Sequence, residues 1–307
     1  MNAVHIGISG WRYTPWRKDF YPEGLAQKNE LRFASRAVSS IEINGSFYAL
    51  QTPDRYAQWY AETPKGFVFS VKAPRYITHV RRLKEIEVPM ANFFASGLLQ
   101  LRDRLGPILW QFPPNFQFDA ERFEAFLRLL PRTMAQARDC AKGCDERLRK
   151  PGYLETPRRG KLRHAVEIRH ASFAVPAFVA LLRKYKVAWV IADTAGKWPY
   201  AEDLTADFVY IRLHGDAELY KSGYSEQALG HWRQRIERWA QGGQVRDAVT
   251  IGPRGRALAA GREVFCYFDN DVKVRAPYDA RALIDQLGLG KGLEGRPGER
   301  DSPGDAT

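Results

Sequence analysis

The segment AVEIRH, residues 165–170, has the length and apolar character of a short buried strand, yet it carries Glu167 and Arg169 two positions apart. Successive side chains of a β-strand point to opposite faces, so these two charges share one face and Ile168 lies on the other. An apolar face against helices and a charged inner face are typical of a barrel with a polar site at one end. The segment therefore predicts such a barrel.

The rest of the chain alternates short strand-like runs with longer helical patterns. Runs of β-branched and aromatic residues predict eight strands, at residues 5–9, 40–44, 67–72, 107–112, 165–170, 188–193, 208–214 and 264–270. Amphipathic patterns between them predict helices over residues 31–38, 53–63, 94–105, 119–131, 176–185, 225–241 and 279–287. Asp119 and Ser225 stand at N-cap positions. The alternation predicts an α/β fold, a (β/α)8 TIM-type barrel, although an open doubly wound sheet has the same rhythm.

Two segments interrupt the alternation. We expect one barrel domain over residues 1–288, with a basic insertion at 132–163 between strands four and five. From residue 138 to 163 the chain carries nine Lys and Arg against four Asp and Glu. The tail, 289–307, is rich in Gly, Pro and charge, and such a composition predicts disorder.

Composition limits the class of protein. The chain has 307 residues, 45% of them hydrophobic, and a formal net charge of +12. That charge favours polyanions or anionic substrates as partners, and an ordinary basic surface accounts for it equally well. It lacks a membrane-length apolar run and a secretory signal, so we expect a cytoplasmic protein without a membrane partner. The oligomeric state stays open, and a monomer is compatible with the sequence. Cys140, Cys144 and Cys266 are too few for a disulfide framework, and the C-x3-C has no second Cys/His pair.

Strand parity gathers charges inside the predicted barrel. In each strand, alternate residues face the helices and should be apolar, so the residues between them face the barrel interior. Near the C-terminal ends of the strands these interior residues are polar, and this is the end where barrel enzymes have their active sites. The predicted inward residues are Glu42, Asn44, Lys72, Gln111, Glu167, Arg169, Asp193, Arg212, His214 and either Asp269 or Asn270. So many ionisable groups favour a ligand or catalytic site over a purely structural salt-bridge network, because buried charges are costly to desolvate.

The residue types admit two kinds of ligand. A divalent metal is one, with Glu42, Glu167, Asp193, His214 and Asp269 as candidate ligands, but no H-E-x-x-H or H-x-H motif is present. The cations compete for those carboxylates and are better suited to clamp a phosphate or carboxylate. The loops that follow the strands are aromatic, at 10–16, 45–53, 73–79, 112–116, 196–200 and 215–225. They are suited to stack on bases or sugars, or to pack against one another.

Seven motifs in order carry a family resemblance: GISGWRYTPW (7–16), SIEINGSFYALQTP (40–53), FVFSVKAPRYITH (67–79), LWQFPPNF (109–116), AVEIRH (165–170), YIRLHG (210–215) and CYFDND (266–271). Together with FYP (20–22) they resemble the YecE-like family, domain of unknown function 72, over about residues 4–288. The resemblance implies a TIM-type barrel without a settled activity. Its pattern commonly has Ser-Thr where this chain has Gly45-Ser46, and Asn-Asn-Asp near Asp269. The positions that match the motifs are Trp11, Glu42, Asn44, Tyr48, Lys72, His79, Gln111, Glu167, Arg169, His170, Arg212, His214 and Asn270.

These residues suggest an enzyme that acts on a phosphate-bearing substrate, with nucleic acid among the candidates, by phosphodiester or sugar-phosphate chemistry. Glu42 or Glu167 would be the general acid or base, and His214 would transfer protons or bind metal. Lys72, Arg169 and Arg212 would stabilise the anion. The other matched positions, Trp11, Asn44, Tyr48, His79, Gln111, His170 and Asn270, would contact the substrate. A nucleic-acid-binding module without chemistry and a small-molecule sensor are the alternatives.

Overall fold

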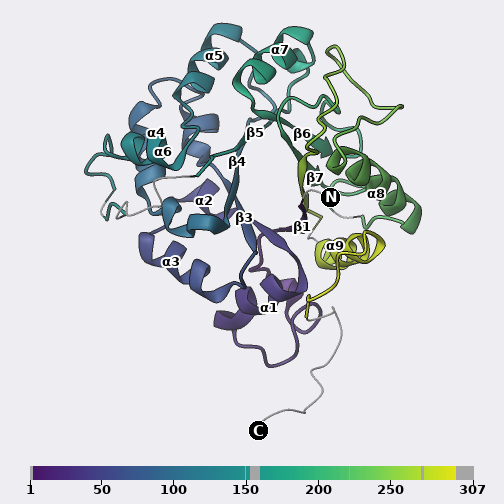
Figure 1. Ribbon diagram of the computed structural model, residues 1–307. Helices are drawn as coiled ribbons and strands as arrows, with labels where there is room; N and C mark the ends of the chain where they lie inside the picture. Colours follow the sequence, from purple (N-terminus) through teal and green to yellow (C-terminus); the bar gives the residue numbers. More distant parts are fainter. Residues whose placement is uncertain (1–2, 149, 153–159, 221, 271–272, 295–307) are drawn as a thin grey trace.

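The computed structural model is a closed barrel of eight parallel strands in chain order, surrounded by helices (Figure 1). The strands are β1 (Val4–Ser9), β2 (Ser40–Ile43), β3 (Val68–Lys72), β4 (Leu105–Gln111), β5 (His164–Glu167), β6 (Ala188–Asp193), β7 (Phe208–Leu213) and β8 (Glu263–Phe268). β1 pairs with both β2 and β8, which closes the sheet. All eight expected strands are confirmed, and the open sheet is excluded. The structure describes residues 3–148, 150–152, 160–220, 222–270 and 273–294.

The α-helices of the described residues are α1 (Glu30–Ala37), α2 (Gly45–Tyr48), α3 (Pro53–Glu62), α4 (Glu87–Ala95), α5 (Ala120–Leu129), α6 (Met134–Ala141), α7 (Pro176–Tyr185), α8 (Glu226–Ala240) and α9 (Arg275–Gln286). Both expected N-caps form, because the side chain of Asp119 accepts from the Arg122 N–H and that of Ser225 from the Ala228 N–H. None of the helices in the described ranges is long and apolar enough to cross a membrane.

The helix expected at 94–105 is wrong. Residues 87–95 form α4, and a 3-10 segment, Leu98–Arg104, follows it. Gly97 separates the two with a φ of 103°, a left-handed backbone conformation that ends a helix and that glycine adopts without strain. The pattern misled because α4 is buried on most of its surface, and so it lacks an amphipathic stripe.

The basic segment 132–163 is built onto the outside of the barrel. Its helix α6 packs against α4 through buried residues such as Met134 and Ala137, and the two helices lie side by side in Figure 1. Further along, the Asp145 N–H donates to the side chain of Asn92 on α4. Residues 149 and 153–159 lie outside the described part. Of the tail expected to be disordered, 289–294 returns to α1, where the Glu294 N–H donates to the Arg36 carbonyl, and 295–307 lies outside the described residues.

The lumen changes character from one end to the other. An inner apolar cluster fills the barrel, made of Leu109, Ala165, Ala188, Val190, Ala192, Phe208, Tyr210, Phe265 and Tyr267. Two of its members have polar tips: the hydroxyl of Tyr210 lies 2.6 Å from that of Ser70, and the hydroxyl of Tyr267 lies 2.8 Å from that of Ser40. These hydroxyls connect the apolar layer to charged residues near the C-terminal ends of the strands.

Candidate functional site

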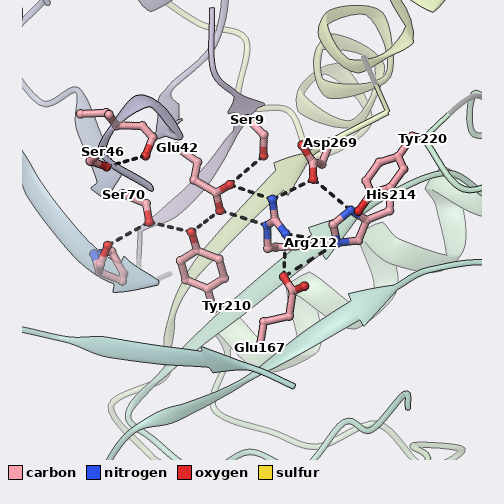
Figure 2. A network of polar contacts seen from close by, with 12 residues as sticks. Ser9, Glu42, Ser46, Ser70, Glu167, Tyr210, Arg212, His214, Tyr220 and Asp269 are labelled. Atoms are coloured by element: carbon pink, nitrogen blue, oxygen red, sulfur yellow. Dashed lines mark hydrogen bonds and ion pairs between the residues drawn. The ribbon is translucent and has the colours of Figure 1, made fainter. Parts of the chain in front are cut away.

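A network of charged side chains occupies the C-terminal end of the lumen (Figure 2). Glu42 and Arg212 lie near the ends of β2 and β7, and Glu167 ends β5. Asp269 and His214 directly follow β8 and β7. The structure thus brings these five residues together, as parity predicted.

Arg212 is the centre of this network and is fully buried. Its Nε and Nη2 donate to Glu42 at 3.1 and 2.9 Å, and its Nη1 donates to Glu167 Oε2 at 2.6 Å. Nη2 also donates to Asp269 Oδ2 at 2.8 Å. One guanidinium therefore holds three carboxylates, and it has little capacity left to bind a substrate anion.

Glu42 is saturated with hydrogen bonds. Besides Arg212, the Ser9 hydroxyl donates to Oε1 at 3.0 Å and the Tyr210 hydroxyl donates to Oε2 at 2.6 Å (Figure 2). A carboxylate offers about four acceptor positions, and here four donors fill them. Glu42 is also fully buried, so its position suits the orientation of Arg212 better than proton transfer with a substrate.

Glu167 and Arg169 form the pair that the opening segment predicts. The Nε of Arg169 donates to Glu167 Oε1 at 2.7 Å, and the guanidinium stacks 3.7 Å above the ring of Trp198. Burial opposes the charge of Glu167, but attraction to Arg169 and Arg212 outweighs it and holds the pKa of Glu167 well below its usual range. Glu167 is therefore a fixed anion, with one cation at each oxygen.

Asp269 is the carboxylate of the network that retains a free oxygen. Its Oδ2 accepts from Arg212 and lies 3.0 Å from Nδ1 of His214, whereas Oδ1 has no hydrogen bond from any described residue. Burial opposes its charge, but Arg212 and the contact with His214 outweigh burial and hold the pKa of Asp269 well below its usual range. His214 is fully buried, with its ring edge-on to Tyr220.

Lys72 ends β3 and is 8% exposed. Within the described part of the chain, its ammonium has no carboxylate within 4.0 Å, and it lies 4.3 Å from the centre of the Phe47 ring. Burial and repulsion from Arg212 lower the pKa of Lys72 to about 8, although Glu42, Asp269 and Glu167 act in the other direction. Lys72 thus differs from the other lumen cations, which are ion-paired.

His79 and Gln111 lie near these charges. His79 contacts Phe47 edge-on, and burial, together with Lys72 and Arg169, lowers the pKa of His79 to about 4. Gln111 pairs in register with Glu167, and its buried Oε1 has no partner among the described residues. His79 is therefore neutral near pH 7, and Gln111 keeps an acceptor available.

Asp193 does not belong to the lumen, so its predicted inward placement is wrong. The inner face of β6 is formed by the small residues Ala188, Val190 and Ala192, which leaves Asp193 on the outer face. There its Oδ2 accepts from the Tyr224 hydroxyl at 3.0 Å, and burial raises the pKa of Asp193.

Of the two candidates at the end of the last strand, Asp269 is the one that faces the lumen. Asn270 points outward, where its Nδ2 donates to Asp279 at 2.7 Å and to the Ser222 carbonyl at 2.9 Å. His170 also points away from the network, since its Nδ1 accepts from the Ser172 N–H as an N-cap. Both residues brace loops of the mouth and do not join the charged network.

The metal hypothesis does not fit this donor set. Among the described residues, no group of three or more His, Cys, Asp or Glu side chains could hold a metal ion. The three lumen carboxylates converge on the guanidinium of Arg212, which takes the position that a cation would need, and the fourth proposed carboxylate, Asp193, faces outward. The three cysteines are free thiols.

Other residues complete the site although the sequence analysis did not single them out. Ser9 and Tyr210 hold Glu42, while Trp198 and Tyr220 contact Arg169. The inward parity of β1 and β7 could have indicated Ser9 and Tyr210. The other two come from loops, whose side-chain directions do not follow from periodicity. Trp11, Asn44 and Tyr48 lie together at the rim, where they line one cavity.

A closed parallel barrel with a buried charge network at its C-terminal mouth defines the chain as a TIM-barrel protein. Within that class it belongs to the family described as protein of unknown function DUF72, whose family model matches residues 5–302. The resemblance to the YecE-like family drawn from the seven motifs is thereby confirmed.

Two curated relatives carry similar sequences. The UPF0759 protein YunF of Bacillus subtilis (strain 168) is 31% identical over 130 residues, which are 41% of this chain and 45% of that protein. The UPF0759 protein YecE of Escherichia coli (strain K12) is 26% identical over 113 residues, 37% of this chain and 39% of that protein. The matched segments span less than half the length of either relative.

Solved structures agree on the fold. A DUF72 family protein from Thermotoga maritima superposes with a TM-score of 0.69 at 24% identity, and the match covers 94% of this chain and all of that one. A DUF72 family protein from Enterococcus faecalis gives a TM-score of 0.63 at 16% identity, with 94% and 99% covered. At these identities the likeness establishes the fold alone.

Proposed function

We propose that the protein is an enzyme that acts on a phosphate-bearing substrate at the C-terminal mouth of the barrel, by hydrolysis of a phosphodiester or a sugar phosphate. The observation that carries this proposal is Lys72. A largely buried ammonium without a close counter-ion is costly, because burial removes most of the water around its charge and no described carboxylate lies within 4.0 Å to replace it. An anionic substrate group beside Lys72 would supply the missing charge.

The neighbours of Lys72 supply the other roles. Arg169 donates to Glu167 through its Nε alone, and its Nη2 lies 3.4 Å from the Tyr220 hydroxyl. The guanidinium therefore keeps N–H donors for a phosphate oxygen. Asp269 is anionic, and its free Oδ1 can orient an attacking water. Its lowered pKa makes it a weak base, so it takes the proton only as the water oxygen bonds to phosphorus and becomes acidic. Glu42 and Arg212 fix the positions of these groups.

The proposed hydrolysis moves two protons, one to Asp269 and one from Lys72. The oxygen of a water molecule bonds to phosphorus while its proton passes to Asp269, and the bond from phosphorus to the leaving oxygen breaks. Lys72 gives its proton to that leaving oxygen. Asp269 then releases its proton to solvent, and Lys72 takes one up from solvent. A pKa of about 8 suits Lys72 to this role, because a general acid works best when its pKa lies near the working pH.

The test is a screen of phosphomonoesters, phosphodiesters and short oligonucleotides with wild type, Lys72→Met and Asp269→Asn. We expect turnover of at least one class, reduced about 100-fold or more in both variants, in line with the usual size of general acid–base effects. Glu263→Gln is the matched control, because Glu263 is a carboxylate of β8 that also pairs with basic residues, His5 and Arg163, but lies at the other end of that strand. No turnover of any phosphate compound, or full turnover in both variants, would overturn the proposal.

A further inference from the structure

A cavity of about 290 Å³ opens at the rim of the barrel, between the loop after β1, the helix α2 and the helix α3. It lies at the end of β2, because Ile43 and Asn44 on its wall directly follow Glu42 in the chain. Its volume is near the lower end of the roughly 300–1,000 Å³ usual for small-molecule sites. The cavity therefore suits a single ring system with a short substituent.

Two residues that line the cavity carry buried polar atoms without partners in the described part of the chain. The Nε1–H of Trp11 is a buried donor, and Oδ1 of Asn44 is a buried acceptor, and neither has a hydrogen bond to any described residue. Trp11 is 6% exposed. Buried polar atoms are almost always paired in folded proteins, so an unpaired donor and an unpaired acceptor on two lining residues point to a ligand with the complementary pair.

The cavity has aromatic walls and one open side. Trp11 and Trp59 meet edge to face with ring centres 5.2 Å apart, and Tyr48 stands at the entrance, 72% exposed. Gly45 also lines the cavity, and a Cβ there would first meet the Gln51 side chain at 3.5 Å, an ordinary contact. A larger side chain at position 45 would fill the cavity without strain at its first atom.

Two cations line the same cavity. Arg12 and Arg55 are both exposed, and neither has an ion pair with a described acidic residue. The Nη1 of Arg55 donates to the Gln51 side chain at 2.8 Å, which directs the guanidinium along the wall. An anionic group attached to the bound ring would form ion pairs with these two guanidinium groups.

We propose that this cavity binds the base of a nucleotide, with Trp11 and Asn44 on the polar edge of the base and Arg12 and Arg55 at its phosphate. A nucleobase presents a donor beside an acceptor on one flat edge, and it stacks on aromatic side chains. The phosphate at Arg12 and Arg55 is not the reacting phosphate, which the proposed function places at Lys72 and Arg169. The inference therefore rests on that function only for the reacting group, and it narrows the substrate class to nucleotides with more than one phosphate.

The test measures equilibrium binding of AMP, GMP, CMP and UMP by quenching of tryptophan fluorescence, with ribose 5-phosphate and inorganic phosphate as probes that lack a base. We expect at least one nucleotide to bind about tenfold or more tightly than ribose 5-phosphate, because a stacked base contributes about 1–3 kcal/mol. Gly45→Leu should abolish that difference, because the added side chain occupies the space of the base. Trp11→Phe should weaken nucleotide binding up to about tenfold, the usual range for one hydrogen bond.

Tyr76→Ala is the matched control, because Tyr76 is a rim aromatic in a separate cavity on the other side of Tyr48. Equal binding of nucleotides and ribose 5-phosphate, or an unchanged difference in Gly45→Leu, would overturn the inference. The two proposals fail separately. Phosphate turnover without base-dependent binding rejects this one, while base-dependent binding without turnover of any phosphate compound rejects the proposed function.

Discussion

The guanidinium of Arg212 and the carboxylate of Glu42 form a two-bond pair, 3.1 Å from Nε to Oε2 and 2.9 Å from Nη2 to Oε1, and neither side chain is exposed to solvent. The other sides of Arg212 contact Glu167 and Asp269. Because the pair spans the lumen from β2 to β7, it fixes the positions of the carboxylates around it.

The first prediction concerns this pair. Glu42→Gln removes one charge of a fully desolvated pair, and we expect the free energy of unfolding to fall by about 3–5 kcal/mol. Urea unfolding followed by circular dichroism measures the loss. Glu263→Gln provides the comparison, because Glu263 is more exposed than Glu42. Similar losses in the two variants would show that Glu42 is not specially required by the network.

The architecture could be predicted from the sequence, and so could most of the network. Glu42, Lys72, Glu167 and Arg212 are inward-facing strand residues, and period-two alternation determines their direction. Asp193 was misplaced because Ala188, Val190 and Ala192 are apolar enough to suit a helix-packed face, although they are small enough to line the lumen opposite large aromatics. Parity within one strand cannot decide which apolar face is the inner one.

The rest of the site depends on geometry that no local pattern encodes. Trp198 and Tyr220 contact Arg169 from loops that follow β6 and β7. The saturation of Glu42 also depends on Ser9 and Tyr210, which are distant in the chain. The sequence therefore identifies which charges meet, but not which of them keep a free oxygen or a free donor.

The second prediction separates substrate binding from structure at Arg169. Arg169→Gln removes the stacked cation above Trp198 while Arg212 still neutralises Glu167. We expect KM for the phosphate substrate to rise about tenfold or more, since a hydrogen bond to a charged group contributes about 1.5–3 kcal/mol. The melting temperature serves as the control. A large loss of stability with KM unchanged would assign the residue to the barrel core.

The third prediction concerns the pH dependence that Lys72 confers. The pKa of Lys72 is about 8 in the folded protein, so binding of inorganic phosphate should weaken as pH rises through 8 and the ammonium loses its proton. In Lys72→Arg this decline should move to much higher pH, because a guanidinium stays charged. Isothermal titration calorimetry from pH 6.5 to 9.5 measures both curves. Parallel curves in the two proteins would contradict the role of Lys72.

Stability should respond to the same group with the opposite sign. Between about pH 8 and the ordinary pKa of 10.5, the folded state holds fewer protons at Lys72 than the unfolded state does. The contribution of this group to the free energy of unfolding therefore rises with pH across that window. The fourth prediction is that Lys72→Met lacks this rise, as measured by urea unfolding at pH 7.5, 8.5 and 9.5. The same slope in both proteins would refute the lowered pKa.

The last prediction asks whether the net charge of +12 serves nucleic acid. Several cations of the 132–163 segment already have acidic partners: Arg138 and Lys142 contact Asp139, and Arg147 contacts Asp145. Arg12 and Arg55 have no such partner among the described residues. We therefore expect duplex DNA, if it binds, to use the rim arginines more than the segment.

Fluorescence anisotropy with a labelled duplex between about 50 and 200 mM salt measures this, because each phosphate neutralised adds about −0.9 to the log–log slope. The double variant Arg12→Gln, Arg55→Gln should make the slope shallower by nearly two contacts, and the triple variant Arg138→Gln, Lys142→Gln, Arg147→Gln by less than one. A larger change in the triple variant would move the contact to the basic segment. A flat salt response in the wild type would remove nucleic acid from the substrates and leave the small phosphate compounds.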